Sequence, residues 1–162
     1  MKNNFESLLV RSIRHYFTTN HITAFTERRP QTRYKKQFVD IIIDSPTIGY
    51  LAVECKSIGG KYLHFSANFN EVEDGLNHVH QVETINYYIT QTGRTGYLAV
   101  EVRSKAKKVG NRFYMIPWGD VLARFNTGSK GYNVKELRQY PEVVKDIVVG
   151  KTKLYNVRPL FS

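Results

Sequence analysis

The sequence predicts one α/β domain in which a mixed β-sheet is flanked by helices. Three observations support this fold class. Residues 38–56 contain two β-branched, apolar runs separated by a turn signal, which is typical of a β-hairpin. Residues 4–18 and 77–92 carry apolar side chains at helical spacing, which is typical of amphipathic helices that cover a sheet. Residues 96–102 are apolar on both faces for most of their length, as in a central strand.

Length and composition indicate a single globular unit. The chain has 162 residues, of which 41% are hydrophobic and 13% aromatic, and this is enough to bury a sizeable core. No internal repeat, low-complexity tract or linker interrupts it. We therefore expect one domain over residues 1–162, with its core at about 4–125 and a C-terminal helix and basic arm at 132–162.

The charge balance favours a polyanionic partner. Lys and Arg number 24 against 14 Asp and Glu, for a net charge of +10 at pH 7. No apolar run approaches the roughly 18–20 residues that cross a bilayer, and the first residues do not form a signal-peptide core. Because a lone Cys55 cannot form an internal disulfide, we expect a cytoplasmic protein with no membrane partner.

The first predicted helix spans residues 4–18, and Glu6 lies beside its apolar stripe, from which it can reach over a neighbouring sheet. Residues 22–26 predict a first strand. Residues 28–36 predict a polar loop, of the kind that often contacts a phosphate backbone, although an ordinary solvated loop is the alternative. The cations of this loop are Arg28, Arg29, Arg33, Lys35 and Lys36.

The hairpin at 38–56 sets the register of the site. Residues 45–49 contain proline and glycine and predict the turn, so a hairpin symmetric about Thr47 places Asp40 opposite Glu54. Side chains alternate between faces along a strand, so Asp40, Glu54 and Lys56 share one face. The other face is aliphatic and consists of Ile41, Ile43, Leu51 and Val53.

The predicted pair of carboxylates indicates a site for a hard cation. Directly opposite Cβ atoms lie roughly 4.5–5.5 Å apart, and two carboxylates that close repel each other unless a cation sits between them. Mg²⁺ prefers oxygen ligands, and Lys56 can position a water or stabilise phosphate charge. The alternative is a solvated strand face on which Lys56 pairs with Glu54. The apolar surroundings favour the metal site, because buried charges need partners.

Later elements follow in order. The helix at 77–92 has Asn77 as its predicted N-cap and Gly93 as its stop. Gln81 lies one residue off the apolar stripe of this helix, where an amide can orient a water or a phosphate. A second basic cluster, at 103–112, connects the strand at 96–102 to a further strand. Beyond these come elements predicted at 112–117 (strand), 118–125 (helix), 141–149 (helix, with Pro141 in its first turn) and 151–162 (a basic arm).

Asp40 followed by Glu54-Cys55-Lys56 resembles the D…(D/E)-x-K signature of the PD-(D/E)XK nuclease superfamily. Glu6, in the first helix, resembles the extra metal-site glutamate of archaeal-type Holliday junction resolvases. The likeness covers about residues 5–118.

Two further segments extend the resemblance. Phe65 to Phe69, followed by His80-Gln81 at the start of a helix, is similar to RecU-type resolvases of bacteria, in which a helix glutamine follows the catalytic lysine. Val39 departs from the family, which usually has proline before the aspartate. Thr32 lies near the position at which archaeal resolvases carry a serine.

The resemblance implies a restriction-endonuclease-like fold with an αβββαβ core, and hydrolysis of DNA phosphodiesters that depends on Mg²⁺, for which Mn²⁺ can substitute. By resemblance, the metal ligands are Glu6, Asp40 and Glu54, with the backbone carbonyl of Cys55 as an extra ligand. Lys56 then activates the water and Gln81 supports it. The expected DNA-binding residues are Arg28, Arg29, Thr32, Arg33, Lys35, Lys36, Lys105, Lys107 and Lys108.

Among nucleases of this kind, we expect a resolvase of four-way junctions from an archaeal, bacterial or viral source. Two coordinated cuts imply a symmetric homodimer. One alternative is another endonuclease of the superfamily, acting in restriction, repair or phage DNA processing. A second is a non-catalytic nucleic-acid-binding protein, although a phosphate binder gains nothing from clustered carboxylates.

Overall fold

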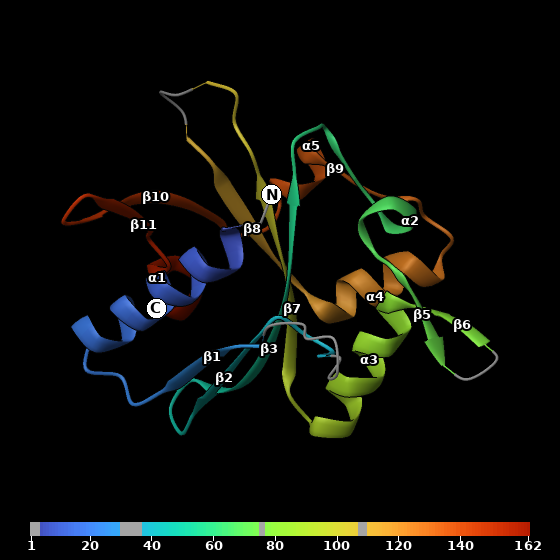
Figure 1. The fold of residues 1–162 in the computed structure, drawn as a ribbon, viewed down its shortest axis with the longest axis horizontal. Helices are drawn as coiled ribbons and strands as arrows, with labels where there is room; N and C mark the ends of the chain where they lie inside the picture. The colour runs from blue at the N-terminus through green and yellow to red at the C-terminus, as the bar shows by residue number, and fades with distance from the viewer. Residues whose placement is uncertain (1–3, 30–36, 75–76, 107–109) are drawn as a thin grey trace.

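The computed structural model describes residues 4–29, 37–74, 77–106 and 110–162 (Figure 1). Within these residues, a seven-stranded sheet has the order β1-β2-β3-β7-β8-β10-β11. Strands β3 and β7 are parallel and the other neighbours are antiparallel, so the sheet is mixed as predicted. Its strands are β1 (Phe25–Arg28), β2 (Ile41–Ser45), β3 (Gly49–Ile58), β7 (Thr95–Val102), β8 (Arg112–Pro117), β10 (Glu142–Val149) and β11 (Thr152–Tyr155).

Two small antiparallel ladders and several helices surround this sheet. The ladders pair β4 (Tyr62–His64) with β9 (Gly131–Asn133), and β5 (Glu71–Asp74) with β6 (Asn77–His80). The helices are α1 (Phe5–Thr19), α2 (Phe65–Asn68), α3 (Gln81–Thr92), α4 (Trp118–Asn126), α5 (Val134–Leu137) and α6 (Arg158–Phe161). None of the helices in the described residues is long and apolar enough to cross a membrane.

The helices cover the two faces of the sheet, as Figure 1 shows for α1 on one side and for α3 and α4 on the other. Alternate residues of the β2–β3 hairpin supply both cores. Ile42 and Ala52 pack with Val82 and Ile85 of α3. The opposite face packs against α1 and contains the four aliphatic residues that the sequence places there: Ile41, Ile43, Leu51 and Val53.

The register of the β2–β3 hairpin is the predicted one. Ile41 pairs with Val53, and Ser45 closes the ladder against Gly49. Ser45 Oγ accepts the backbone N–H groups of Thr47 and Ile48, at 3.3 and 3.1 Å, which shapes the turn. Gly49 has a φ of 112°, a conformation that glycine adopts without strain. The turn residues and the alternation therefore specify the same register.

The chain then crosses from β3 through α3 to the parallel strand β7. This helix ends at Gly93 as predicted, with a left-handed φ of 70°. Its start differs from the prediction, because residues 77–80 form β6. The N-cap is therefore His80 and not Asn77, and His80 Nδ1 accepts the backbone N–H of Val82 at 3.1 Å.

The prediction of a helix at 141–149 is wrong. This segment is β10, in which Val143 is buried and its neighbours Glu142 and Val144 are exposed. Its β-branched residues suit a strand, and β8 provides the partner for the ladder. A proline near the start of a segment is compatible with a helix but does not specify one.

The predicted basic arm at 151–162 is also wrong. These residues form β11 and α6, and Leu154, Tyr155 and Val157 are buried. Tyr155 and Val157 belong to the core beneath α1, and Phe161 stacks on Tyr16 of that helix. The C-terminal segment is therefore part of the same packed structure as the first helix.

Candidate functional site

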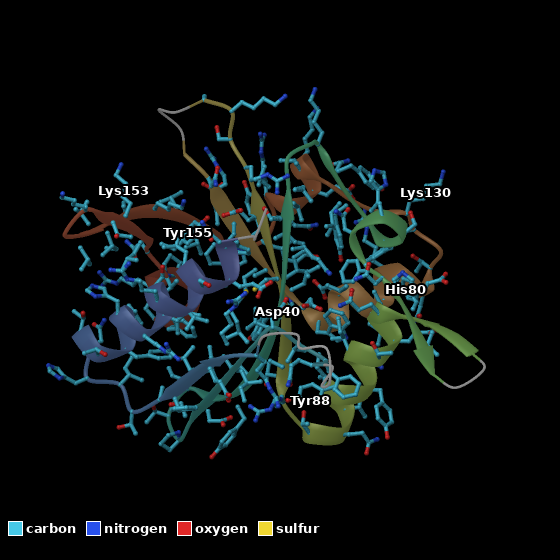
Figure 2. All side chains as sticks on the ribbon, viewed as in Figure 1. Asp40, His80, Tyr88, Lys130, Lys153 and Tyr155 are labelled. Atoms are coloured by element: carbon cyan, nitrogen blue, oxygen red, sulfur yellow. The ribbon has the colours of Figure 1, made fainter. Side chains whose placement is uncertain are left out.

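Asp40 lies immediately before β2, near the middle of the molecule (Figure 2). Its backbone N–H donates to Val53 O at 3.2 Å, which continues the pairing with β3. Its side-chain Oδ2 accepts the backbone N–H of Cys55 at 2.8 Å. The carboxylate is thereby held across the strand pair, beside the next residue of interest, Glu54.

Glu54 of β3 is a buried carboxyl, with only 2% of its surface exposed. Burial raises its pKa well above the usual range, and the hydrogen-bonding and charged contact with Asp40 raises it further. The positive charge of Lys56 acts in the opposite direction. The two carboxyl groups are thus close neighbours, and the site favours either a proton or a cation between them.

Gln81, the first residue of α3, connects this acidic pair to the lysine. Its Nε2 donates to Glu54 Oε2 at 3.0 Å, and its Oε1 accepts from Lys56 Nζ at 3.2 Å. The backbone N–H of Asn70 also donates to Gln81 Oε1, at 3.1 Å. The amide is therefore oriented from both ends, and four of the residues singled out from the sequence meet on one face of the sheet.

Two residues that contact Lys56 or Gln81 were not assigned a role from the sequence. Phe69 lies under the ammonium group, with Nζ 4.7 Å from the ring centroid, which is a cation–π contact. Asn70 acts through its backbone N–H, and a backbone group carries no side-chain signal. Only the family-like segment Phe65 to Phe69 pointed toward this region.

Glu6 lies in the first turn of α1 and faces Arg28, whose Nε donates to Glu6 Oε2 at 3.1 Å. Burial and the charge of Asp40 raise the pKa of Glu6, while Arg28 lowers it. Glu6 is therefore within electrostatic range of the carboxylate pair. Its role as a metal ligand stays a prediction.

Cys55 points away from the candidate site. Its side chain is buried in the core beneath α1, and burial raises the pKa of the thiol well above its usual range. A neutral thiol in that position is a small core residue and not a nucleophile. Only its backbone faces Asp40, so the proposed carbonyl ligand stays a prediction.

The predicted DNA-binding residues are only partly placed. Arg29 lies next to the site, because its backbone N–H donates to Asp40 O at 2.6 Å. Lys105 is exposed in the connection between β7 and β8. Arg28 pairs with Glu6, as described above. The other predicted contacts lie outside the described residues: Thr32, Arg33, Lys35, Lys36, Lys107 and Lys108.

The donor set fits a magnesium ion. Asp40 and Glu54 offer oxygen atoms. Burial, together with the neighbouring Asp40, raises the pKa of Glu54, and a divalent cation between the two carboxylates would offset both effects. Among the residues that the structure describes, no three or more His, Cys, Asp or Glu side chains form a ready-made metal site. Mg²⁺ is commonly held by one or two carboxylates, with water and phosphate completing its shell.

No family model matches this sequence, and no curated protein matches it. Among the solved structures, this chain is similar to Archaeoglobus fulgidus Hjc, a Holliday junction resolvase from an archaeal hyperthermophile. The two are 17% identical, the match covers 85% of this chain and 91% of that chain, and the TM-score is 0.51. The chain has the restriction-endonuclease-like fold, which confirms the fold expected from the sequence.

Proposed function

We propose that this protein is a Mg²⁺-dependent endodeoxyribonuclease that cuts four-way DNA junctions. The observation that carries the proposal is the hydrogen-bonded set on one sheet face, in which Gln81 joins buried Glu54 to Lys56 beside Asp40. The fold is the one that Hjc, a resolvase, also has. The excess of positive charge suits a DNA partner.

Asp40 and Glu54 would hold the metal, with Glu6 and the backbone carbonyl of Cys55 as further ligands. The chemistry that Mg²⁺ supplies when bound is charge neutralisation at the phosphate and activation of a water molecule. Lys56, oriented by Gln81, supplies a positive charge where negative charge develops on the phosphate, or positions the attacking water. The proposed dimer would present two such sites to two opposed strands of a junction.

A purely structural role explains these residues poorly. Burying Glu54 next to Asp40 is unfavourable in the absence of a cation, as the raised pKa of Glu54 indicates. A protein that only binds phosphate has no use for two adjoining carboxylates. These properties favour catalysis over simple DNA binding.

The test is cleavage of labelled four-way junction, linear duplex, splayed-arm and single-stranded DNA, with and without Mg²⁺. We expect Mg²⁺-dependent, paired nicks placed symmetrically on opposed strands of the junction. Asp40→Asn or Glu54→Gln should abolish cleavage and leave DNA binding intact or tighter, because a negative charge near the phosphate is removed. The matched control is Asp146→Asn, which removes an exposed carboxylate of β10 and should leave cleavage unchanged.

Other outcomes point elsewhere. If junction and duplex are cut equally in competition, the protein is a restriction-type or DNA-processing endonuclease and not a resolvase. Tight binding without cutting in either Mg²⁺ or Mn²⁺ would favour a non-catalytic DNA-binding protein. Near-normal turnover in Asp40→Asn would contradict the proposed metal site.

A further inference from the structure

A stacked aromatic pair lies beside the candidate site. The rings of Phe38 and Tyr88 are 5.4 Å apart between centroids and are inclined by only 11°. Phe38 nevertheless remains 45% exposed, so Tyr88 covers only part of its ring. A large apolar ring that is fixed from one side and open to solvent on the other can accept a second flat group.

The supporting ring of this pair is anchored by charged groups. Arg29 Nη1 donates to the Tyr88 hydroxyl at 3.0 Å, and the charge of Arg94 lies close enough to Tyr88 to be influenced by it. Arg94 is itself held by Asp44, with Nη1 2.6 Å from Oδ1. Tyr88 also packs against the core beneath α3. The position of the Phe38 ring is therefore set before any ligand binds.

The pair is adjacent to the residues of the proposed reaction. Two positions of chain separate Phe38 from Asp40, so their Cα atoms are at most about 7 Å apart. Tyr88 lies on α3, the helix that begins with Gln81. The side chain of Arg29 contacts Tyr88, and its backbone N–H donates a hydrogen bond to the backbone carbonyl of Asp40. A ligand on Phe38 would thus lie next to a phosphate held at Asp40.

Exposure alone does not distinguish Phe38 from other surface aromatics. Phe25 and Tyr50 are 61% and 58% exposed, respectively. Among the described residues, however, neither of them stacks on another ring. Phe38 combines an open ring, a fixed backing ring and a neighbouring arginine. Proteins that bind single-stranded nucleic acid use this combination: a base stacks on the aromatic ring, and a phosphate lies near the cation.

We propose that the open face of Phe38 stacks against an unpaired nucleobase of the bound DNA, next to the phosphate that is cut, while Arg29 contacts the backbone of the same strand. The inference rests on the proposed function, because it takes DNA as the ligand. Branch points are where bases can leave the helical stack, so this contact would favour branched over linear DNA. Phe38 would be a positioning residue for the substrate.

The first experiment compares Phe38→Leu with Phe25→Leu. Each change keeps an apolar side chain and removes an aromatic face. Phe25, however, pairs with Asp44 at the end of β1 that is far from Arg28 and Asp40. Affinity for a four-way junction and for single-stranded DNA is measured by fluorescence anisotropy with Ca²⁺ in place of Mg²⁺, so that no cleavage is needed. Phe38→Leu should bind about 5- to 100-fold more weakly, and Phe25→Leu should bind like the unmodified protein.

The second experiment places a fluorescent ring at the same position. Trp118 is 3% exposed and is the only tryptophan in the sequence, so its emission is a constant background. In Phe38→Trp, junction binding should quench the added tryptophan by stacking. Phe25→Trp should show no quenching.

Several results would overturn the inference. Equal affinities of Phe38→Leu and Phe25→Leu, or no quenching in Phe38→Trp despite tight binding, would exclude stacking. Dissociation of Phe38→Leu into smaller species in sedimentation, with no quenching in Phe38→Trp, would show that a second copy of the chain covers this ring. Because binding is measured without turnover, failure of the nuclease proposal alone would leave these data interpretable.

Discussion

At the scale of single residues, Gln81 is the link on which the candidate site depends. Its amide donates to the buried carboxylate of Glu54 and accepts from the ammonium group of Lys56. Because it touches both groups, Gln81 orients the residues proposed to hold the metal and to stabilise the phosphate.

We expect Gln81→Met to lower Mg²⁺-dependent cleavage by about 10- to 100-fold, the usual effect of removing a group that orients metal ligands. Methionine retains a similar length and removes the side-chain hydrogen bonds to Glu54, Lys56 and the backbone of Asn70. The measurement is single-turnover cleavage of a junction over a range of Mg²⁺ concentrations. Gln91→Met, at an exposed position of the same helix, is the control and should cleave normally. Equal rates for the two variants would contradict the assigned role of Gln81.

Glu54 provides a test by pH. A carboxyl whose pKa is raised in the folded state stabilises the fold at low pH, and this contribution disappears as pH rises through the raised pKa. In a chelator, unmodified protein should therefore become less stable relative to Glu54→Gln as the pH rises above 4.5, the ordinary value of this group. Melting temperatures of both proteins across this range measure the difference.

Added Mg²⁺ is the control for the pH experiment. It should raise the melting temperature of the unmodified protein at neutral pH and have less effect on Glu54→Gln, because one ligand charge is missing. If the melting temperatures of the two proteins in chelator change with pH in parallel, the charged form of Glu54 is not destabilised by its surroundings.

At the scale of elements, the placement of Gln81 depends on how closely α3 lies on β7. Gly96 of β7 lies under this helix, and a Cβ at this position would be 2.3 Å from Ile89 Cδ1 and 2.9 Å from Trp118 Cβ. Neither distance is tolerated without movement of the neighbours. The absence of a side chain at Gly96 therefore permits the close packing of α3 and α4 on the sheet.

We expect Gly96→Ala to lower the free energy of unfolding by about 1–3 kcal/mol, as is usual for overpacking. At about 2–4 °C per kcal/mol for a chain of this size, the melting temperature should fall accordingly. The matched control is Gly119→Ala in α4, where an added Cβ meets nothing within 4 Å. Alanine is a better helix former than glycine, so this variant should be as stable as the parent or slightly more stable. Equal melting temperatures would show that the packing around Gly96 relaxes freely.

At the scale of the whole molecule, the net charge of +10 predicts DNA binding that weakens steeply with salt. The DNA is expected to bind mainly near the site, where Arg28 and Arg29 lie within hydrogen-bonding distance of Glu6 and Tyr88. The cations of β10 and β11 lie elsewhere, and Figure 2 shows Lys153 well away from Asp40.

Replacing Arg28, Arg29 and Arg33 together by alanine should weaken junction binding and reduce the slope of log K against log salt. On duplex DNA, the reduction is roughly 0.9 for each phosphate that the variant no longer neutralises. Arg33 enters this test from the sequence, since it lies outside the described residues. The matched control replaces Lys145, Lys151 and Lys153 by glutamine, which removes the same charge. An unchanged slope in the arginine variant would show that these arginines do not neutralise DNA phosphates.

The sequence by itself determined the β2–β3 hairpin, its register and the faces of its side chains. These features follow from signals close together in the chain: a turn at Ser45 to Gly49, and alternation with period two on either side of it. The same holds for the apolar stripe of α1 and for the end of α3 at Gly93. Gln81 could be predicted from its position and from the resemblance, but not the groups that it touches.

Only the tertiary structure decided what these elements touch. Residues 141–149, expected to form a helix, contain strand β10 because this segment pairs with β8. The local sequence does not indicate a pairing partner that is distant in the chain. In the same way, the crossover from β3 through α3 to β7 brings Gln81 to Glu54 and Lys56, and Tyr88 beneath Phe38. Local backbone and side-chain preferences specify an element, whereas the contacts between elements depend on packing the whole chain around two cores.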